Sequence, residues 1–201
     1  FLITLCKGLR DSGETRLPRG SIGITRIFDL YTDGINAQLA GKLEDKTVGH
    51  LDFELKNPVV RDALKQLAQA MLNTQSRSLP ARDARRIVRA VREDHEWEKG
   101  LFKGLVAAGA LLIYEGQNAD GEHVQRVLIG YERFADHVIA RELLRNPVPD
   151  QIAAHARRHP GLLQALCVQV PEKTGQEAFE LVPALLEQHG IADAYLDSLV
   201  W

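Results

Sequence analysis

The chain has 201 residues, of which 45% are hydrophobic and 26% charged, and its formal net charge is −2. This composition is that of a globular chain and excludes a disordered or fibrous protein. A charge so close to neutral provides no overall attraction for nucleic acid or acidic membranes, so binding of either would need a local patch.

Residues 1–50 are predicted to form a helical subdomain. The apolar residues Leu2, Leu5 and Leu9 fall at helical spacing, and Gly13 is suited to ending the first helix. Ser21 is a suitable N-cap for a second helix. The apolar positions of this second helix form one stripe along its surface: Ile24, Ile27, Phe28, Tyr31, Ile35 and Leu39. The polar stretch from Gly41 to His50 predicts a loop.

Residues 51–145 are predicted to form a winged-helix subdomain, with three helices and a two-stranded β-hairpin. The first helix begins near Pro58, a second opens at Leu79-Pro80, and a third runs from about Glu96 to Ala108 and ends at Gly109. The apolar run Ala110 to Tyr114 and the run His123 to Ile129 are typical of strands. The residues Asn118 to Gly121 between these runs favour a turn.

A further helix from Tyr131 to Leu144 follows the hairpin directly, and residues 146–201 continue as short helices. Their bounds are set by Pro, Gly and His residues: Pro149 to Arg158, Pro160 to Val170, Gly175 to His189 and Ile191 to Leu199. We interpret this last part as a helical linker or the start of a stacked α-helical array. The predicted fold is therefore mainly α.

Three segments of the chain, taken in sequence order, resemble STAND-class P-loop ATPases of the NACHT and NB-ARC kind, especially prokaryotic antiviral-defence members. Phe1 to Leu9 followed by Leu17-Pro18 is similar to the helix after their nucleotide-contacting proline segment. Tyr131 to Leu144 is similar to the helix that closes their winged-helix subdomain, and Leu166 to Gly175 to the linker helix that follows. The resemblance implies that the chain is a piece of a longer protein whose nucleotide-binding core precedes residue 1.

In this family the helical and winged-helix subdomains hold the protein closed over ATP or ADP with Mg²⁺, then swing away to allow oligomerisation. The resemblance thus implies a regulatory module whose partners are the rest of its own chain, further copies of it, and an unknown protein trigger. The sequence has no GxxxxGK[ST] phosphate loop, so we expect no cofactor and no ATPase activity in this segment itself.

The resemblance also names candidate nucleotide-binding residues at the start of the helix after the wing. The alignment places Tyr131 where NACHT proteins carry a phosphate-sensing histidine, and His137 is the only histidine nearby. A tyrosine hydroxyl can donate a hydrogen bond to phosphate, and Arg133 can add a charge-assisted one. The alternative, which these residues favour, is structural: Asp136 and His137 pair locally or fix the wing against the helix.

A DNA-binding winged-helix regulator is the alternative function. It is suggested by a face of arginines on one predicted helix: Arg82, Arg85, Arg86, Arg89 and Arg92. The third helix, which usually enters the major groove in winged-helix proteins, begins with Glu96 and Glu98, and these carboxylates would repel phosphate. We therefore expect no nucleic-acid partner.

Metal-binding, membrane and hydrolase functions have little support. Cys6 and Cys167 form no CxxC pair, and His155 and His159 are too few ligands for zinc and flank two arginines. No secretory signal is visible, and the longest nearly uncharged run is shorter than the roughly 20 residues of a membrane span. We expect a cytoplasmic protein. We also expect Leu2, Leu5 and Leu9 to be exposed, because the domain that would cover them precedes the chain.

Overall fold

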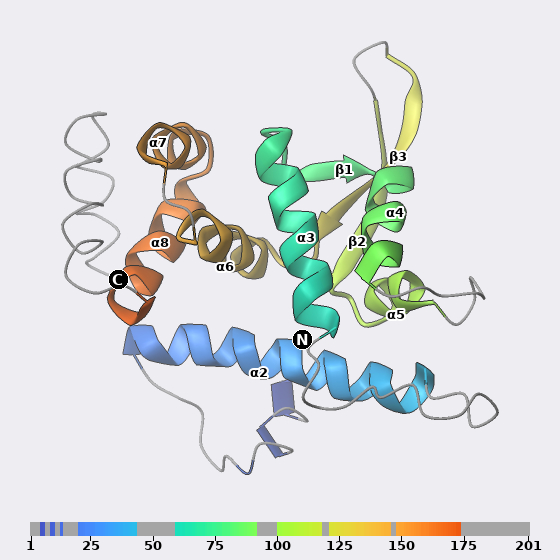
Figure 1. The fold of residues 1–201 in the computed structure, drawn as a ribbon, viewed down its shortest axis with the longest axis horizontal. Helices are drawn as coiled ribbons and strands as arrows, with labels where there is room; N and C mark the ends of the chain where they lie inside the picture. Colours follow the sequence, from blue (N-terminus) through green and yellow to red (C-terminus); the bar gives the residue numbers. More distant parts are fainter. Residues whose placement is uncertain are drawn as a thin grey trace. The chain divides into compact units, whose positions relative to one another are not determined.

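A computed structural model describes residues 5–6, 9–10, 13, 20–43, 59–91, 100–117, 121–145 and 148–173 of the chain. This part is mainly helical and contains one small three-stranded antiparallel sheet (Figure 1). The chain forms two compact units: unit 1 comprises residues 1–17 and 27–131, and unit 2 comprises residues 18–26 and 132–201. The division at residues 50 and 145 expected from the sequence stays a prediction.

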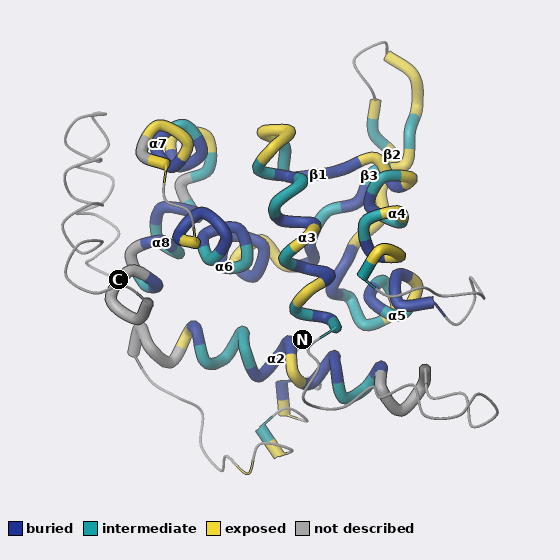
Figure 2. The backbone as a smooth tube through the Cα atoms, viewed as in Figure 1, coloured by how far each residue is buried: buried dark blue, intermediate teal, exposed yellow. Residues whose placement is uncertain are grey.

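Helix α2 (Gly20–Leu43) contributes its first turns to unit 2 and the rest to unit 1. The prediction of a helix here is confirmed, but the predicted loop start at Gly41 is wrong, because the helix continues to Leu43. Within unit 1 the predicted apolar stripe is buried at Tyr31, Ile35 and Leu39, as Figure 2 shows along the middle of the helix.

Unit 1 continues with α3 (Val59–Asn73), β1 (Ser78–Pro80), α4 (Ala81–Val91), α5 (Leu101–Ala107), β2 (Leu111–Gln117) and β3 (His123–Ile129). The strands lie in the order β1-β3-β2, and both pairings are antiparallel. The core is formed by the inward sides of these elements. It includes Leu64, Leu67, Met71, Leu79, Val88, Leu101, Leu105, Leu111, Val127 and Ile129.

Strand β1 corrects the two-stranded hairpin expected from the sequence. Ser78 and Leu79 pair with Leu128 and Val127 of β3, so Leu79-Pro80 ends a strand, and the next helix begins at Ala81. A three-residue strand is too short to show an alternating pattern of its own, and its pairing depends on residues far along the chain.

The end of α5 follows the predicted glycine stop. Gly109 has φ 74°, the N–H of Gly109 donates to the carbonyl of Val106 (3.0 Å), and the N–H of Ala110 donates to the carbonyl of Leu105 (2.9 Å). This pair of bonds satisfies carbonyls that the helix end would otherwise leave without partners, and only glycine adopts this backbone conformation without strain. The helix thus stops shortly before the sheet begins. Its predicted start near Glu96 is wrong, because the N-cap Gly100 has an extended backbone (φ −70°, ψ 153°) and the helix begins at Leu101.

Unit 2 contains α6 (Glu132–Leu143), α7 (Pro149–Arg158) and α8 (Pro160–Lys173). The predicted bounds of α7 are confirmed, and α8 runs three residues beyond the predicted end at Val170. Helices α6 and α8 pack closely together. Their apolar side chains form the core of this unit with those of α7, and include Phe134, Ile139, Leu143, Ile152, Leu162 and Leu166.

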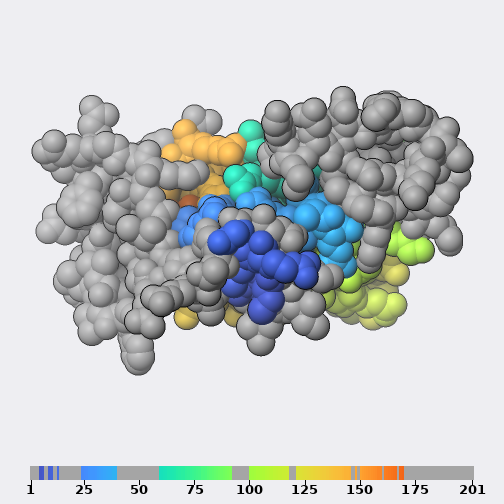
Figure 3. All heavy atoms as spheres, turned by 90° about the horizontal axis from the view of Figure 1, so that it is seen from below, coloured from blue at the N-terminus to red at the C-terminus, as the bar shows by residue number. Residues whose placement is uncertain are grey.

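The first apolar residues of the chain are less exposed than expected. Figure 3 shows the described residues of this first segment, in the darkest blue, on the surface of the molecule beside the lighter blue of α2. Leu5 is buried, so its expected exposure is wrong, while Leu9 is half-buried and Leu2 lies outside the described residues. The Leu5 side chain is therefore covered by the chain itself.

Two expectations concern the C-terminal part and the membrane. The helices expected at Gly175 to His189 and Ile191 to Leu199 lie outside the described residues. In the part of the chain that the structure describes, no helix combines the length and the apolar character needed to cross a membrane.

Candidate functional site

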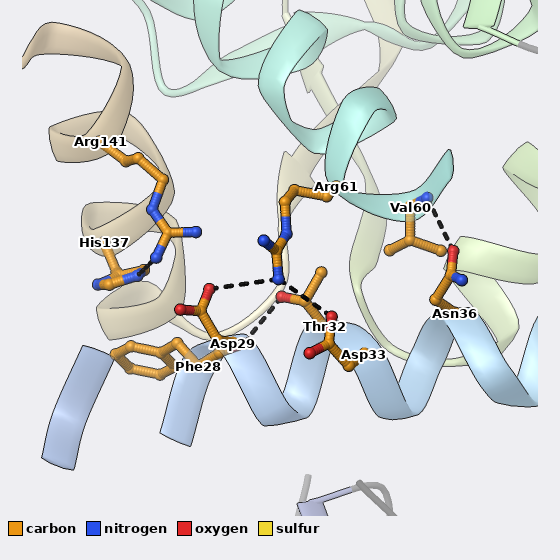
Figure 4. A network of polar contacts seen from close by, with 9 residues as sticks. All are labelled: Phe28, Asp29, Thr32, Asp33, Asn36, Val60, Arg61, His137 and Arg141. Carbon is orange, nitrogen blue, oxygen red and sulfur yellow. Dashed lines mark hydrogen bonds and ion pairs between the residues drawn. The ribbon is translucent and has the colours of Figure 1, made fainter. Parts of the chain in front are cut away.

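A polar network joins α2 to the start of α3 in unit 1 (Figure 4). The guanidinium of Arg61 lies 3.0 Å from Asp33 and 3.6 Å from Asp29. The side-chain oxygen of Asn36 accepts a hydrogen bond from the N–H of Val60 at 3.2 Å. Val60 is in the first turn of α3, where backbone N–H groups have no partner within the helix, so Asn36 caps α3 from another helix. This network holds α2, the helix that carries Tyr31, against the start of α3.

Tyr131, the first candidate residue, lies directly after β3 and is the last residue of unit 1. Its side chain is 46% exposed, and its backbone has φ 56°, an unusual conformation for a residue other than glycine. Such a conformation costs about 1–3 kcal/mol and persists only where the surroundings impose it.

Two glycines bring the end of β3 close to the end of α5 just before Tyr131. The N–H of Gly130 donates to the carbonyl of Ala110 at 2.8 Å, and a Cβ on Gly130 would lie 2.1 Å from the carbonyl oxygen of Gly109. Only a residue without a side chain allows this close backbone approach. The end of β3 is therefore held against the end of α5, and Tyr131 begins the path into α6 from a fixed position.

The Tyr131 ring packs edge to face against Tyr31 of α2, with ring centres 6.0 Å apart and planes at 82°. Tyr31 is fully buried. Burial, and secondly the neighbouring Tyr131, raise the pKa of the Tyr31 hydroxyl from 10.0 to about 12. One ring of the pair thus belongs to the core, while the other presents a hydroxyl-bearing side chain at the surface of unit 1.

His137, the second candidate, is buried in unit 2 with 3% of its surface exposed. Its Nε2 lies 3.0 Å from a guanidinium nitrogen of Arg141, and Figure 4 shows the two side chains on adjacent turns of α6. Because a guanidinium has no acceptor, Nε2 accepts this hydrogen bond. Gln169 of α8 places its amide nitrogen 3.1 Å from Nδ1 and donates to the His137 carbonyl at 2.8 Å. A phosphate could reach a ring nitrogen only by displacing Arg141 or Gln169.

Asp136 is also buried and faces the first turn of α8. A Cβ on Gly161 would lie 2.3 Å from one oxygen of its carboxylate. Glycine therefore permits α8 to approach α6 at this point. The position is also electrostatically favourable, because a carboxylate is stabilised at the positive end of a helix.

Arg133, the third candidate, is exposed on α6 and donates a hydrogen bond to the side-chain oxygen of Gln164 on α8. Arg133 and His137 thus both contact α8 from α6, within unit 2. Tyr131 belongs to unit 1. Sequence reasoning missed Gly161, Gln164 and Gln169. The only signal for them was their place on a predicted helix, which does not identify partners.

The arginine face of α4 is mostly exposed at Arg82, Arg86 and Arg89, and Arg92 lies outside the described residues. Arg85 differs from them. Its guanidinium lies 5.6 Å from the centre of the Phe102 ring and 3.5 Å from the side-chain oxygen of Gln125. One of the five arginines therefore fastens α4 to α5 and β3.

Comparisons of this chain with protein-family models, with curated proteins and with solved structures find no match.

Proposed function

We propose that this chain is the regulatory helical and winged-helix module of a STAND-type ATPase, coupling nucleotide state to opening and oligomerisation in a prokaryotic antiviral-defence or signalling protein. The observation that carries the proposal is the path of the chain through unit 1. Helix α3 is followed by a short strand, two further helices and a hairpin, and the short strand joins the hairpin in the order β1-β3-β2. In the proposed module this order of elements corresponds to a winged helix, with the hairpin as the wing.

The residues after the wing support the regulatory part of the proposal. Only Gly130 and Tyr131 separate β3 from α6 along the chain, so the candidate residues follow the hairpin directly. In the proposed module the side chains of Tyr131 and Arg133 contact the phosphates of ATP or ADP held with Mg²⁺ by the preceding domain. His137 acts there by fixing α6 on α8 through Gln169, while Arg141 of its own helix holds the imidazole ring.

The proposal is tested with the full-length protein that contains this chain, by measuring the rate at which bound ADP dissociates. Losing a charge-assisted hydrogen bond to phosphate corresponds to about a 10- to 100-fold change. We therefore expect Arg133→Ala to accelerate ADP release by that factor and Tyr131→Phe to do so to a smaller extent.

Two control variants each remove a guanidinium or a tyrosine hydroxyl at another position, and both positions are in unit 1. Arg86→Ala removes an exposed arginine whose described partner is Asp83, and Tyr114→Phe removes a hydroxyl that donates to Ser78. Both are expected to leave the ADP release rate unchanged. A full-length protein that binds neither ATP nor ADP would refute the proposal.

DNA binding is the second candidate, and the exposure of Arg82, Arg86 and Arg89 on α4 favours it. Phosphate contacts from these side chains would make binding of duplex DNA fall steeply with salt. Fluorescence anisotropy with a random-sequence duplex at low and moderate salt tests it. Binding that is salt-dependent and lost in a triple Arg82, Arg86, Arg89→Ala variant would support a DNA reader, whereas no binding at low salt would eliminate one.

A further inference from the structure

Two residues other than glycine have a positive φ in the part of the chain that the structure describes, Gln75 at 49° and Tyr131 at 56°. Gln75 has a local reason for this conformation. It follows α3, and its N–H donates to the carbonyl of Leu72 (3.1 Å), while the N–H of Ser76 donates to the carbonyl of Met71 (3.0 Å). This pair of hydrogen bonds ends many helices and places a left-handed residue at the position of Gln75.

The helix-end explanation does not apply to Tyr131, because this residue precedes a helix. Glu132 is the first residue of α6, so Tyr131 stands in the position of an N-cap. N-cap residues ordinarily have an extended backbone. A left-handed conformation is also less favourable for tyrosine than for glycine, asparagine or aspartate. The conformation of Tyr131 therefore needs a cause outside the helix that it begins.

The contacts of the Tyr131 side chain supply such a cause. Its ring packs edge to face on Tyr31, with ring centres 6.0 Å apart, and both residues belong to unit 1. Tyr31 is fully buried, so its ring is a fixed support. A Cβ on Gly109 would lie 4.0 Å from the Tyr131 hydroxyl oxygen, so the other end of the side chain lies at the end of α5. Rotating φ to an extended value would carry the ring away from both places.

We propose that Tyr31 is a positioning residue, whose buried ring holds Tyr131 in the left-handed conformation, and that Tyr131 becomes extended when its ring leaves Tyr31. The edge-to-face contact offsets the strain of the left-handed backbone. Strained residues of this kind are concentrated at switch regions, and the usual conformation of a residue before a helix supplies the second state. The effect of Tyr31 on a bound nucleotide rests on the proposed function, whereas the two conformations of Tyr131 do not depend on it.

NMR of the chain measures the conformation of Tyr131 directly. A positive φ brings the amide proton of a residue close to its own α-proton, which gives a strong NOE between them. We expect this NOE to be strong at Tyr131 in wild type and in Tyr31→Phe, which keeps the ring, and weak in Tyr31→Leu, which removes it. Gln75 is the internal reference, because its positive φ has a local cause and its NOE should stay strong in every variant.

A second variant removes the contact from the exposed side and leaves the core intact. Tyr131→Ala deletes the ring of a residue that is 46% exposed, so the fold should be retained. We expect the NOE at position 131 to become weak, as in Tyr31→Leu. A strong NOE at position 131 in either variant, with that of Gln75 unchanged, would show that the backbone alone imposes the conformation and would overturn the proposal. A weak NOE at Tyr131 in wild type would overturn it as well.

The rate of ADP release from the full-length protein tests the positioning role. Tyr31→Leu should accelerate release about fivefold, as expected for the loss of one neutral hydrogen bond, and Tyr31→Phe should leave the rate unchanged. Adding Tyr31→Leu to Tyr131→Phe should cause no further acceleration, because the hydroxyl that Tyr31 positions is already absent. Additive effects would overturn the positioning role. A protein that binds neither ATP nor ADP refutes the proposed function and this effect with it, and the NOE then decides whether Tyr31 holds Tyr131.

Discussion

The buried hydroxyl of Tyr31 predicts that the stability of unit 1 falls at alkaline pH. The pKa of this group is 10.0 in the unfolded chain and about 12 in the folded protein. Below pH 10 the hydroxyl is protonated in both states and does not affect the pH dependence. Above pH 10 the unfolded chain releases the proton while the folded protein retains it, so the free energy of unfolding decreases with rising pH.

The size of this effect follows from the shift. Each pKa unit corresponds to about 1.4 kcal/mol, so Tyr31 should cost about 1.4 kcal/mol of stability at pH 11 and about 3 kcal/mol well above pH 12. Lysines and other tyrosines also titrate in this range. The measured quantity is therefore the difference in the free energy of unfolding between wild type and Tyr31→Phe, from urea titrations at pH 9 and pH 11.

The substitution Tyr31→Phe keeps the ring and its contact with Tyr131 but removes the ionisable group. We expect the stability of wild type relative to this variant to fall by about 1.4 kcal/mol between the two pH values. Tyr131→Phe is a useful comparison, because burial is the larger cause of the raised pKa and most of the effect should remain. A wild-type to Tyr31→Phe difference that is the same at pH 9 and pH 11 would refute the assigned burial of this hydroxyl.

Three substitutions test the polar contacts by thermal or urea unfolding. Gly161→Ala should destabilise the protein by about 1–3 kcal/mol, because the new methyl group would lie 2.3 Å from the Asp136 carboxylate and force α8 away from α6. Gln169→Leu should cost a similar amount, about 1–3 kcal/mol, since the buried His137 carbonyl loses its amide donor. Asn36→Ala should cost about 1 kcal/mol through loss of the cap on α3.

Each substitution has a matched control. A Cβ on Gly104 would meet only the flexible end of the Leu39 side chain, so Gly104→Ala should be much less damaging than Gly161→Ala. Gln164→Leu removes an amide that contacts the exposed Arg133 and should cost less than Gln169→Leu. For the cap, Asn36→Asp keeps an oxygen acceptor and should retain most of the stability. Equal losses within any of these pairs would contradict the contact that the pair probes.

Local signals were sufficient for most of the helices and for the hairpin. Gly109 stops α5 because its conformation is one that only glycine adopts freely, and Pro149 starts α7 because its missing N–H costs nothing there. Strand β1 could not be predicted in this way. It exists through pairing with β3, and a three-residue run ending in proline has no period to detect.

The candidate site was harder to predict than the fold, for a related reason. The ring nitrogens of His137 are contacted by one neighbour on its own helix and one residue 32 positions away. Helical spacing predicts the first contact, because residues four apart lie on one face. Nothing in the local sequence distinguishes Gln169 from any other polar residue of α8. Likewise Gly161 looks like an ordinary helix-start residue until the position of the Asp136 carboxylate is known.

The sharing of α2 between the two units has a consequence for how this protein folds during synthesis. Unit 2 joins residues 18–26 to residues from 132 onward, so more than 100 residues must leave the ribosome before its two segments can meet. Unit 1 lies almost entirely within that interval and can form first. Contacts so distant in sequence slow folding, because a long loop must close before they contribute any energy. The first turns of α2 can therefore pack only after the last-made part of unit 2 has been synthesised. Translation speed across the β2–β3 hairpin and α6 is expected to affect the yield of correctly folded chain.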